Sequence, residues 1–256
     1  MIRVHPVPAF SDNYLWVLDD GRHAVVVDPG DARPVLEYLA DNHLVLSAIL
    51  CTHHHGDHVG GVGALLDACG AIPVYGPAGE SIPHRTASLR GGDAVILGQP
   101  ALEWKVLDVP GHTAGHIAYV GNGRLFCGDT LFGCGCGRIF EGTAAQLWQS
   151  LETLADLPGD TQVFCAHEYT LSNIRFAQAV DPGNPALQSR QAEDRQRRDR
   201  RQPTLPSTIA RERSTNPFLR CREPALIRAA EAHAGHALDG PAAVFATLRQ
   251  WKNEFK

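Results

Sequence analysis

The chain has 256 residues, 44% of them hydrophobic, and a formal net charge of −5 at pH 7. That content suffices for one large core, or for a main domain with a smaller one, and the near-balanced charge offers no basic field to nucleic acid or an anionic membrane. We therefore expect neither a nucleic-acid partner nor a membrane partner.

The cysteines and the first residues bear on the compartment. Seven cysteines, odd in number and scattered, fit reduced thiols better than a disulfide framework. The first twenty residues contain neither the apolar run nor the small-residue cleavage pattern of a signal peptide. No stretch approaches the roughly 20 apolar residues of a membrane span. We expect a cytoplasmic protein, and a monomer.

The first two thirds of the chain alternate strand-like runs with turns. Each run is short, rich in Val, Ile and Leu, and bounded by Gly, Pro, Asn or Asp. Strands are predicted at 14–20, 23–30, 44–52, 71–76, 93–98, 102–111, 116–129 and 161–167. Apolar residues at three- and four-residue spacing predict helices at 32–42, 58–70 and 143–159, the last with Thr143 as its N-cap.

Beyond His167 the sequence reads as helix and loop only. Helices are predicted at 169–183, 184–202 and 242–256, around a proline-punctuated segment at 203–220. We place the domain boundary near residues 168–175, which gives an α/β domain at 1–170 and a helical domain at 171–256. The six arginines of residues 190–201 are an alternative RNA-binding arm. Three acids offset them and no aromatics are interleaved, so we interpret this run as a solvated helix face.

The run "CTHHHGDHVGG" follows a predicted strand and concentrates possible metal ligands. Alternate side chains of an extended chain point the same way, so His53 and His55 share a direction and His54 points elsewhere. The next glycine lets the chain turn, which places Asp57 and His58 at a helix start. The run therefore offers two ligand pairs for two adjacent metal ions.

Three further candidates complete these pairs, because a catalytic site needs three or more protein ligands and an open position. His112, Asp129 and His167 each follow a predicted strand, and strand ends at one edge of a sheet are where α/β proteins build sites. Isolated histidines elsewhere are interpreted as structural: His5, His23, His43, His84, His233 and His236.

Four residues near this constellation keep open roles. Asp28 could accept a hydrogen bond from a ligating histidine, or could simply form the turn before Pro29. His116 is unassigned. Cys134 and Cys136 are an alternative pair of soft ligands, although their run is a glycine-rich loop.

Four motifs, "THHHGDH", "GHTAGH", "CGDTLF" and "AHEYT", resemble the metallo-β-lactamase superfamily over residues 1 to about 167. The resemblance implies a four-layer αββα sandwich with a dinuclear centre between two sheets, here followed by a C-terminal all-helical domain. It also implies the ligand sets. One metal would take His53, His55 and His112, the other Asp57, His58 and His167, and Asp129 would bridge the two.

Such a centre favours hydrolysis. Two cations lower the pKa of a bridging water and polarise a carbonyl, so a metal-bridging hydroxide is the expected nucleophile, with Asp57 and Asp129 as catalytic carboxylates. A ligand set of histidine and carboxylate suits zinc, which we expect, and also iron or manganese.

Motifs in the second half of the chain indicate the substrate class. "GRIFEGT", "HEYTLSN", "STNPFLR" and "LRQWKNEF" resemble glyoxalase II, the hydroxyacylglutathione hydrolase family, over nearly the whole chain. The resemblance implies hydrolysis of S-(2-hydroxyacyl)glutathione thioesters, chiefly S-D-lactoylglutathione to D-lactate and glutathione, in methylglyoxal detoxification. The residues that it assigns to substrate binding are Arg138, Phe140, Tyr169, Asn173, Arg249 and Lys252.

The sequence differs from the family pattern at two positions, and two alternative functions remain. Position 138 is Arg where many members have Lys, and Phe140 stands where some have Tyr, which removes a hydroxyl. A persulfide dioxygenase shares the first motifs but uses one iron and lacks the helical tail. A nuclease of this fold would need a basic groove. Both remain alternatives to the thioester hydrolase.

Overall fold

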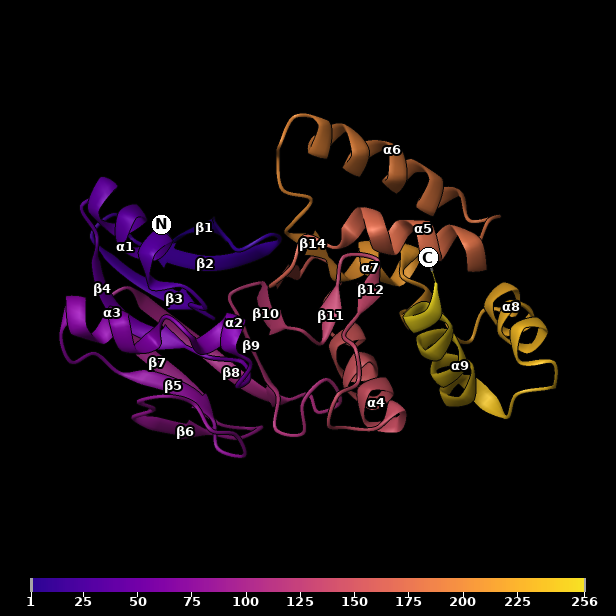
Figure 1. The fold of residues 1–256 in the computed structure, drawn as a ribbon, viewed down its shortest axis with the longest axis horizontal. Helices are drawn as coiled ribbons and strands as arrows, with labels where there is room; N and C mark the ends of the chain where they lie inside the picture. The colour runs from indigo at the N-terminus through magenta and orange to yellow at the C-terminus, as the bar shows by residue number, and fades with distance from the viewer. Residues whose placement is uncertain (1, 256) are drawn as a thin grey trace. The chain divides into compact units, whose positions relative to one another are not determined.

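The computed structural model describes residues 2–255, which divide into two compact units (Figure 1). The first unit contains residues 2–108 and Ala114–Gly128, and the second contains Val109–Thr113 and residues 129–255. Each unit is described by itself below.

A six-stranded sheet organises the first unit. Its strands lie side by side in chain order: β1 (Arg3–Ala9), β2 (Asn13–Asp19), β3 (His23–Val27), β4 (Val45–Leu50), β5 (Val74–Pro77) and β6 (Ala87–Leu89). The first three strands are antiparallel, and β3 to β6 run parallel. Parallel neighbours require crossover connections, and these are α1 (Ala32–Asp41) and the pair α2 (Gly56–Val59) and α3 (Val62–Cys69).

The helices of the first unit cover one face of this sheet. Val17 and Val26 of the strands pack in one buried cluster with Val35 and Leu39 of α1 and Leu65 of α3. Residues three or four apart on a helix lie on one face, so the apolar spacing of 32–42 produces the buried side of α1. Asp31 caps this helix by accepting a hydrogen bond from Arg33 N at 2.9 Å.

Four antiparallel strands form a second ladder in the first unit. They are β7 (Ala94–Gly98), β8 (Ala101–Asp108), β9 (Ile117–Gly121) and β10 (Arg124–Gly128). Their large inward side chains, Trp104, Tyr119 and Phe126, are fully buried. Tyr119 donates its hydroxyl hydrogen bond to Cys51 O at 2.9 Å, which fixes the end of β4 against β9.

Helices dominate the second unit. After the hairpin of β11 (Leu131–Phe132) and β12 (Gly135–Cys136) come α4 (Ala144–Ala155), β13 (Gln162–Cys165), α5 (Thr170–Val180), α6 (Pro185–Asp199), β14 (Ser207–Thr208), α7 (Ile209–Thr215), the short 3-10 helix η1 (Pro217–Leu219), α8 (Pro224–Ala234) and α9 (Gly240–Glu254). Phe176, Phe218 and Phe245 are fully buried, with neighbouring ring centroids 5.9 and 5.8 Å apart. They form an aromatic core between α5, η1 and α9.

Several predicted elements differ in detail. The helix predicted at 58–70 is two helices, because Gly60 and Gly61 interrupt it. A Cβ on Gly61 would lie 2.6 Å from Ala32 N and from Pro29 O, so this turn packs against the loop after β3. The region beyond His167 is not purely helical, because β14 pairs with β13. Strands β1, β6, β11 and β12 and helices α7 and α8 also lie outside the predicted set.

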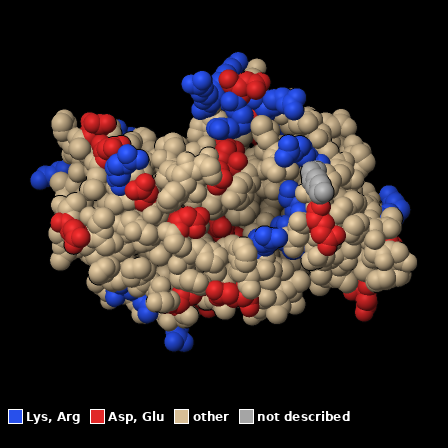
Figure 2. Space-filling view, viewed as in Figure 1, with Lys and Arg blue, Asp and Glu red and all other residues tan. Residues whose placement is uncertain are grey.

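The arginine-rich helix is only partly solvated. Figure 2 shows blue and red atoms gathered together over α6. Arg190 and Asp194, however, are buried at 2% and 1% exposure and form an ion pair at 3.2 Å. The interpretation as a solvated face is therefore wrong for these two residues. Among residues 2–255, no helix has the length and apolar content to span a membrane.

Candidate metal centre

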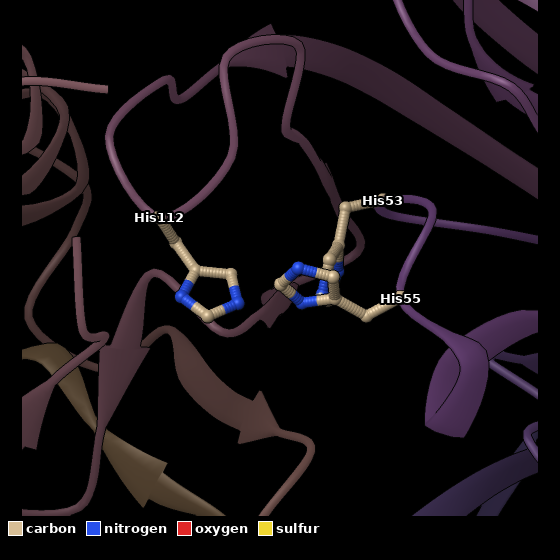
Figure 3. A group of neighbouring side chains, drawn as sticks. All are labelled: His53, His55 and His112. Atoms are coloured by element: carbon tan, nitrogen blue, oxygen red, sulfur yellow. Dashed lines mark hydrogen bonds between the residues drawn. The ribbon is translucent and has the colours of Figure 1, made fainter. Parts of the chain in front are cut away.

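The first unit presents four of the predicted ligands just after β4. The rings of His53 and His55 (Figure 3) approach each other at 3.0 Å, from His53 Nε2 to His55 Nδ1. The ring of His58, on α2, has its centroid 4.0 Å from that of His53. Asp57 lies beside it, with Asp57 Oδ2 3.6 Å from His58 Nε2. The extended chain and the turn into α2 thus bring four of the predicted ligand side chains to one place.

Asp28, at the end of β3, orients this group. Its Oδ1 accepts a hydrogen bond from Thr52 N at 2.7 Å, and its Oδ2 accepts one from Thr52 Oγ1 at 2.8 Å. Asp28 Oδ2 also lies 3.1 Å from His58 Nδ1. A carboxylate at that distance fixes the proton on Nδ1 and leaves the Nε2 lone pair for a ligand role. Of the two interpretations of Asp28, the structure supports the ligand-orienting one.

Close backbone packing holds α2 against the Asp28 loop. A Cβ on Gly30 would lie 1.8 Å from Asp57 O, a distance that no side chain can accommodate. Asp28 itself has a φ of 52°, in the left-handed region where Asp and Asn are among the few tolerated residues. The glycine and the strained aspartate together set the position of Asp57.

His54 and His116 lie beside the ligand candidates in other roles. His54 turns its ring to Glu80, with Nδ1 2.8 Å from Glu80 Oε2, and its backbone N–H donates to the same oxygen at 2.7 Å. This agrees with the alternation expected of the strand. His116 is buried, stacks on the ring of His53 at 4.6 Å, and lies with Nδ1 3.0 Å from Ile117 O. It therefore supports the His53 ring.

The second unit presents the other three predicted ligands around one carboxylate. Asp129 Oδ2 lies 3.4 Å from His112 Nε2, and Asp129 Oδ1 lies 3.3 Å from His167 Nε2. His112 Nδ1 is 2.7 Å from Arg138 O, a carbonyl that can only accept, so Nδ1 carries the proton and Nε2 faces Asp129. Tyr169 stacks on His167, with centroids 4.7 Å apart. Asp129 thus stands between two imidazole nitrogens, as a bridging carboxylate requires.

These donors fit a divalent metal. His53, His58, His112 and His167 are buried, as is Asp129, and buried polar groups in such numbers need strong partners. All seven predicted ligands belong to groups of side chains that could hold a metal ion. Imidazole nitrogens with carboxylate oxygens suit zinc, iron and manganese.

A hollow in the second unit collects most of the predicted substrate residues. It has a volume of about 300 Å³. Its lining includes Arg138, Tyr169, Asn173, Arg249 and Lys252, with Phe132, Cys136, Ser172 and Asn253. Phe140 is not among the lining residues. It is 59% exposed and packs edge-on against His112 at 5.3 Å.

The two cationic side chains of α9, Arg249 and Lys252, differ in their burial and in their contacts within the protein. Arg249 is buried, and it donates to Cys136 O at 2.9 Å and to Asn253 Oδ1 at 3.1 Å. Its charge faces the hollow, but its hydrogen bonds hold the protein itself. Lys252 is half-buried; burial, with the neighbouring charges of Arg249 and Arg175, lowers the pKa of its ammonium group.

The two loop cysteines are poor metal ligands. Burial raises the pKa of Cys134 to about 12 and also raises the pKa of Cys136. Among the residues that the structure describes, neither thiol belongs to a group of donors close enough together to hold a metal ion. Cys134 Sγ instead donates to Thr215 O at 3.3 Å. The alternative of soft ligands is therefore not supported.

Two residues near the ligands escaped the sequence reading. Asn13 Nδ2 donates a hydrogen bond to Asp57 Oδ2 at 3.0 Å, and Glu80 accepts one from the backbone N–H of His54. Asn13 opens β2 and is followed by five hydrophobic residues, which is a local signal that could have found it. Glu80 stands in a loop and has no comparable signal.

The sequence matches two family models over adjacent segments. Residues 10–167 match the metallo-beta-lactamase superfamily, and residues 168–255 match the hydroxyacylglutathione hydrolase C-terminus. The hydroxyacylglutathione hydrolase of Nitrosomonas europaea is 56% identical over 256 residues, covering 100% of this chain and 97% of the relative. That of Cupriavidus taiwanensis is 58% identical over 267 residues, covering 100% of both.

A solved structure adds a likeness in three dimensions. The crystal structure of TTHA1623 in a di-iron-bound form has a TM-score of 0.60 and 27% sequence identity, covering 84% of this chain and 100% of that one. The predicted fold class, a metallo-β-lactamase sandwich followed by a helical C-terminal region, is confirmed by these matches. The chain therefore belongs to the hydroxyacylglutathione hydrolase family, the glyoxalase II branch of the metallo-β-lactamase superfamily.

Proposed function

We propose that the protein hydrolyses S-(2-hydroxyacyl)glutathione thioesters, chiefly S-D-lactoylglutathione to D-lactate and glutathione, and so serves methylglyoxal detoxification in the cytoplasm. Relatives that carry the name hydroxyacylglutathione hydrolase match the chain along its full length. The single observation that carries the proposal is that each unit carries a set of metal-ligand candidates and that the second unit also contains a hollow lined by Arg138 and Lys252.

Seven side chains would hold two divalent metal ions. One ion would take His53, His55 and His112, the other Asp57, His58 and His167, and Asp129 would bridge them. Two such ions, when bound, supply an activated water molecule and polarise the thioester carbonyl. We expect zinc, with iron and manganese as the alternatives. The di-iron form of TTHA1623, a protein 27% identical to this one, supports a dinuclear site.

The chain's own residues orient the reactants. Asp57, held by Asn13, and Asp129, held between His112 and His167, would place two carboxylates beside the attacking water. Hydrolysis adds water across the C–S bond, and the leaving thiol has a pKa near 8.5. It leaves near neutral pH without a dedicated proton donor. The absence of a further acid from the predicted set is therefore consistent with a thioester.

The glutathione half would bind in the hollow of the second unit. Glutathione carries two carboxylates, and Arg138 and Lys252 offer cationic groups to them. Tyr169 and Asn173 line the same hollow, and Phe140 lies next to His112 with 59% of its surface exposed. We propose contact with the substrate for all of these residues, with Arg249 contributing charge and position.

The division of labour follows the two family matches. We propose a catalytic domain at residues 1–170 and a substrate-binding domain at 171–256, which the matches at 10–167 and 168–255 support. The substrate is a small molecule. We propose a monomer, with neither nucleic acid nor membrane as a partner.

One assay tests the proposal. Purified protein loaded with Zn²⁺ is mixed with S-D-lactoylglutathione, and loss of the thioester absorbance is followed with and without a strong chelator. We expect hydrolysis that the chelator abolishes and added Zn²⁺ restores. A metal-loaded protein that leaves the thioester intact would refute the proposed function.

A further inference from the structure

The β11–β12 hairpin connects the metal ligands of the second unit with its hollow. It begins two residues after Asp129, and two of its side chains, Phe132 and Cys136, line the hollow, as does Arg138 just beyond it. A shift of this hairpin would therefore move the lining of the hollow. The position of the hairpin depends on the side chains that contact its tip.

Side chains from four distant elements bind the backbone of this hairpin. Each donates to, or accepts from, one of its peptide groups at hydrogen-bonding distance. The bonds are Asn173 Nδ2 to Gly133 O (3.0 Å), Cys134 N to Glu212 Oε2 (2.8 Å), Asn216 Nδ2 to Gly135 O (2.9 Å) and Arg249 Nη1 to Cys136 O (2.9 Å). Cys134, at the tip, has a φ of 57°, a conformation that a non-glycine residue holds only when its surroundings enforce it.

Glu212 is the hub of these contacts. It is fully buried on α7, and its carboxylate receives hydrogen bonds from Cys134 N, Ser207 Oγ and Asn216 Nδ2. It also forms an ion pair with Arg190 Nη2 at 2.7 Å. A buried carboxylate is tolerated only with such partners, and they leave it a single position. The carboxylate of Glu212 is neither a metal ligand nor a substrate contact in the function proposed above.

We propose that Glu212 is a positioning residue for the substrate: with Arg190 behind it, its carboxylate fixes the hairpin tip through Cys134 N–H and thereby shapes the hollow that takes the glutathione half. This inference rests on the proposed function. The carboxylate acts through the hairpin and does not touch the substrate.

Asp194 provides a matched control. It is the second buried carboxylate of the same network, 3.2 Å from Arg190 Nε and 3.3 Å from Arg211 Nη2. Within residues 2–255, Asp194 makes no hydrogen bond to the hairpin, whereas Glu212 accepts one from Cys134 N. Glu212→Ala and Asp194→Ala each remove one buried carboxylate beside Arg190, and only Glu212→Ala also removes the acceptor of Cys134 N–H. The two variants therefore separate loss of the network from loss of the hairpin anchor.

The variants should differ in KM. The hollow is proposed to take the glutathione half, remote from the reacting bond, so a displaced lining should weaken substrate binding more than it slows turnover. We expect Glu212→Ala to raise KM for S-D-lactoylglutathione by about tenfold or more, equivalent to about 1.4 kcal/mol of binding free energy, with a smaller change in kcat and unchanged metal content. Asp194→Ala should also lower the unfolding temperature but keep KM within about twofold of the parent. Equal KM in Glu212→Ala and the parent, or equal KM increases in both variants, would overturn the proposal.

Two further measurements keep the test decisive if Glu212→Ala folds poorly. Asn216→Ser keeps an oxygen to cap Phe218 N but loses the amide that binds Gly135 O, and it should raise KM in the same way. Hydrogen exchange of the amides of residues 131–136 should accelerate in Glu212→Ala or Asn216→Ser and not in Asp194→Ala. Unchanged exchange and KM in both hairpin variants would refute the positioning role.

Failure of the proposed function can be distinguished from failure of the positioning role of Glu212. A metal-loaded parent that does not hydrolyse the thioester refutes the function, and hydrogen exchange then still decides whether Glu212 anchors the hairpin. An active parent whose hairpin variants keep KM and exchange rates refutes the positioning role alone.

Discussion

Replacing Asp28 with asparagine should weaken one of the two metals selectively. The substitution keeps the shape of the side chain, and asparagine tolerates the φ of 52° found at this position. One carboxylate oxygen must become an NH₂ group. Because Thr52 N can only donate, the remaining oxygen is expected to stay at 2.7 Å from it, and the NH₂ group then faces His58 Nδ1.

The magnitude follows from the tautomer of His58. An NH₂ group beside Nδ1 favours the form with the proton on Nε2, and that form cannot bind a metal through Nε2. The loss of a hydrogen bond to a charged group is worth about 1.5–3 kcal/mol. At 1.4 kcal/mol per tenfold, this corresponds to a roughly 10- to 150-fold higher Kd for the metal held by His58. The other metal should keep its affinity.

The assay is a competition titration of Zn²⁺ between the protein and a chromogenic chelator, which resolves the two binding steps. Asp31→Asn is the matched control, because Asp31 lies in the same loop and only caps α1. Two unchanged Kd values for Asp28→Asn, or an equal loss in Asp31→Asn, would refute the argument that Asp28 sets the tautomer of His58.

Three other outcomes are expected. Asp129→Ala should lower the content of both metals, measured by elemental analysis, because one carboxylate serves both; retention of two ions per chain would contradict the bridge. Burial, then the charges of Arg249 and Arg175, lowers the pKa of Lys252 from its ordinary 10.5. The charged form is present below that lowered pKa and lost as pH rises through it, so KM should rise at lower pH in the parent than in Lys252→Arg; coincident KM profiles would count against this. His54→Ala should lose the contacts of the His54 ring with Glu80 and with the His55 ring, with metal content and turnover kept and ~1 kcal/mol or less of stability lost in a denaturant titration.

Local patterns predicted the parts of the site that follow from strand geometry. His53 and His55 share a direction and His54 diverges, as alternation in an extended chain requires. Strand β1 was missed because Pro6 and Pro8 interrupt its pattern, and prolines are accepted here because β1 is an edge strand. Helix α8 carried signals that could have been used, with a proline in its first turn and a glycine with φ of 77° at its end.

The rest depended on contacts between residues far apart in sequence. Glu212 reaches Cys134 across 78 positions, and Asn13 reaches Asp57 across 44. No periodicity or spacing encodes such a pair, because burial creates it only once the elements have packed. The same holds for Arg190, which lies in a polar run and becomes buried through its partners Asp194 and Glu212.

The burial of the thiols bears on how this protein tolerates its own product. Six of the seven cysteines are buried, and burial raises the pKa of Cys51, Cys134, Cys136, Cys165 and Cys221. Thiol–disulfide exchange requires a thiolate with access to the partner sulfur. A hydrolase that releases glutathione therefore exposes little of its own sulfur to mixed-disulfide formation. Cys69, which is only partly buried and also has a raised pKa, is the one thiol that glutathione disulfide could reach without local unfolding.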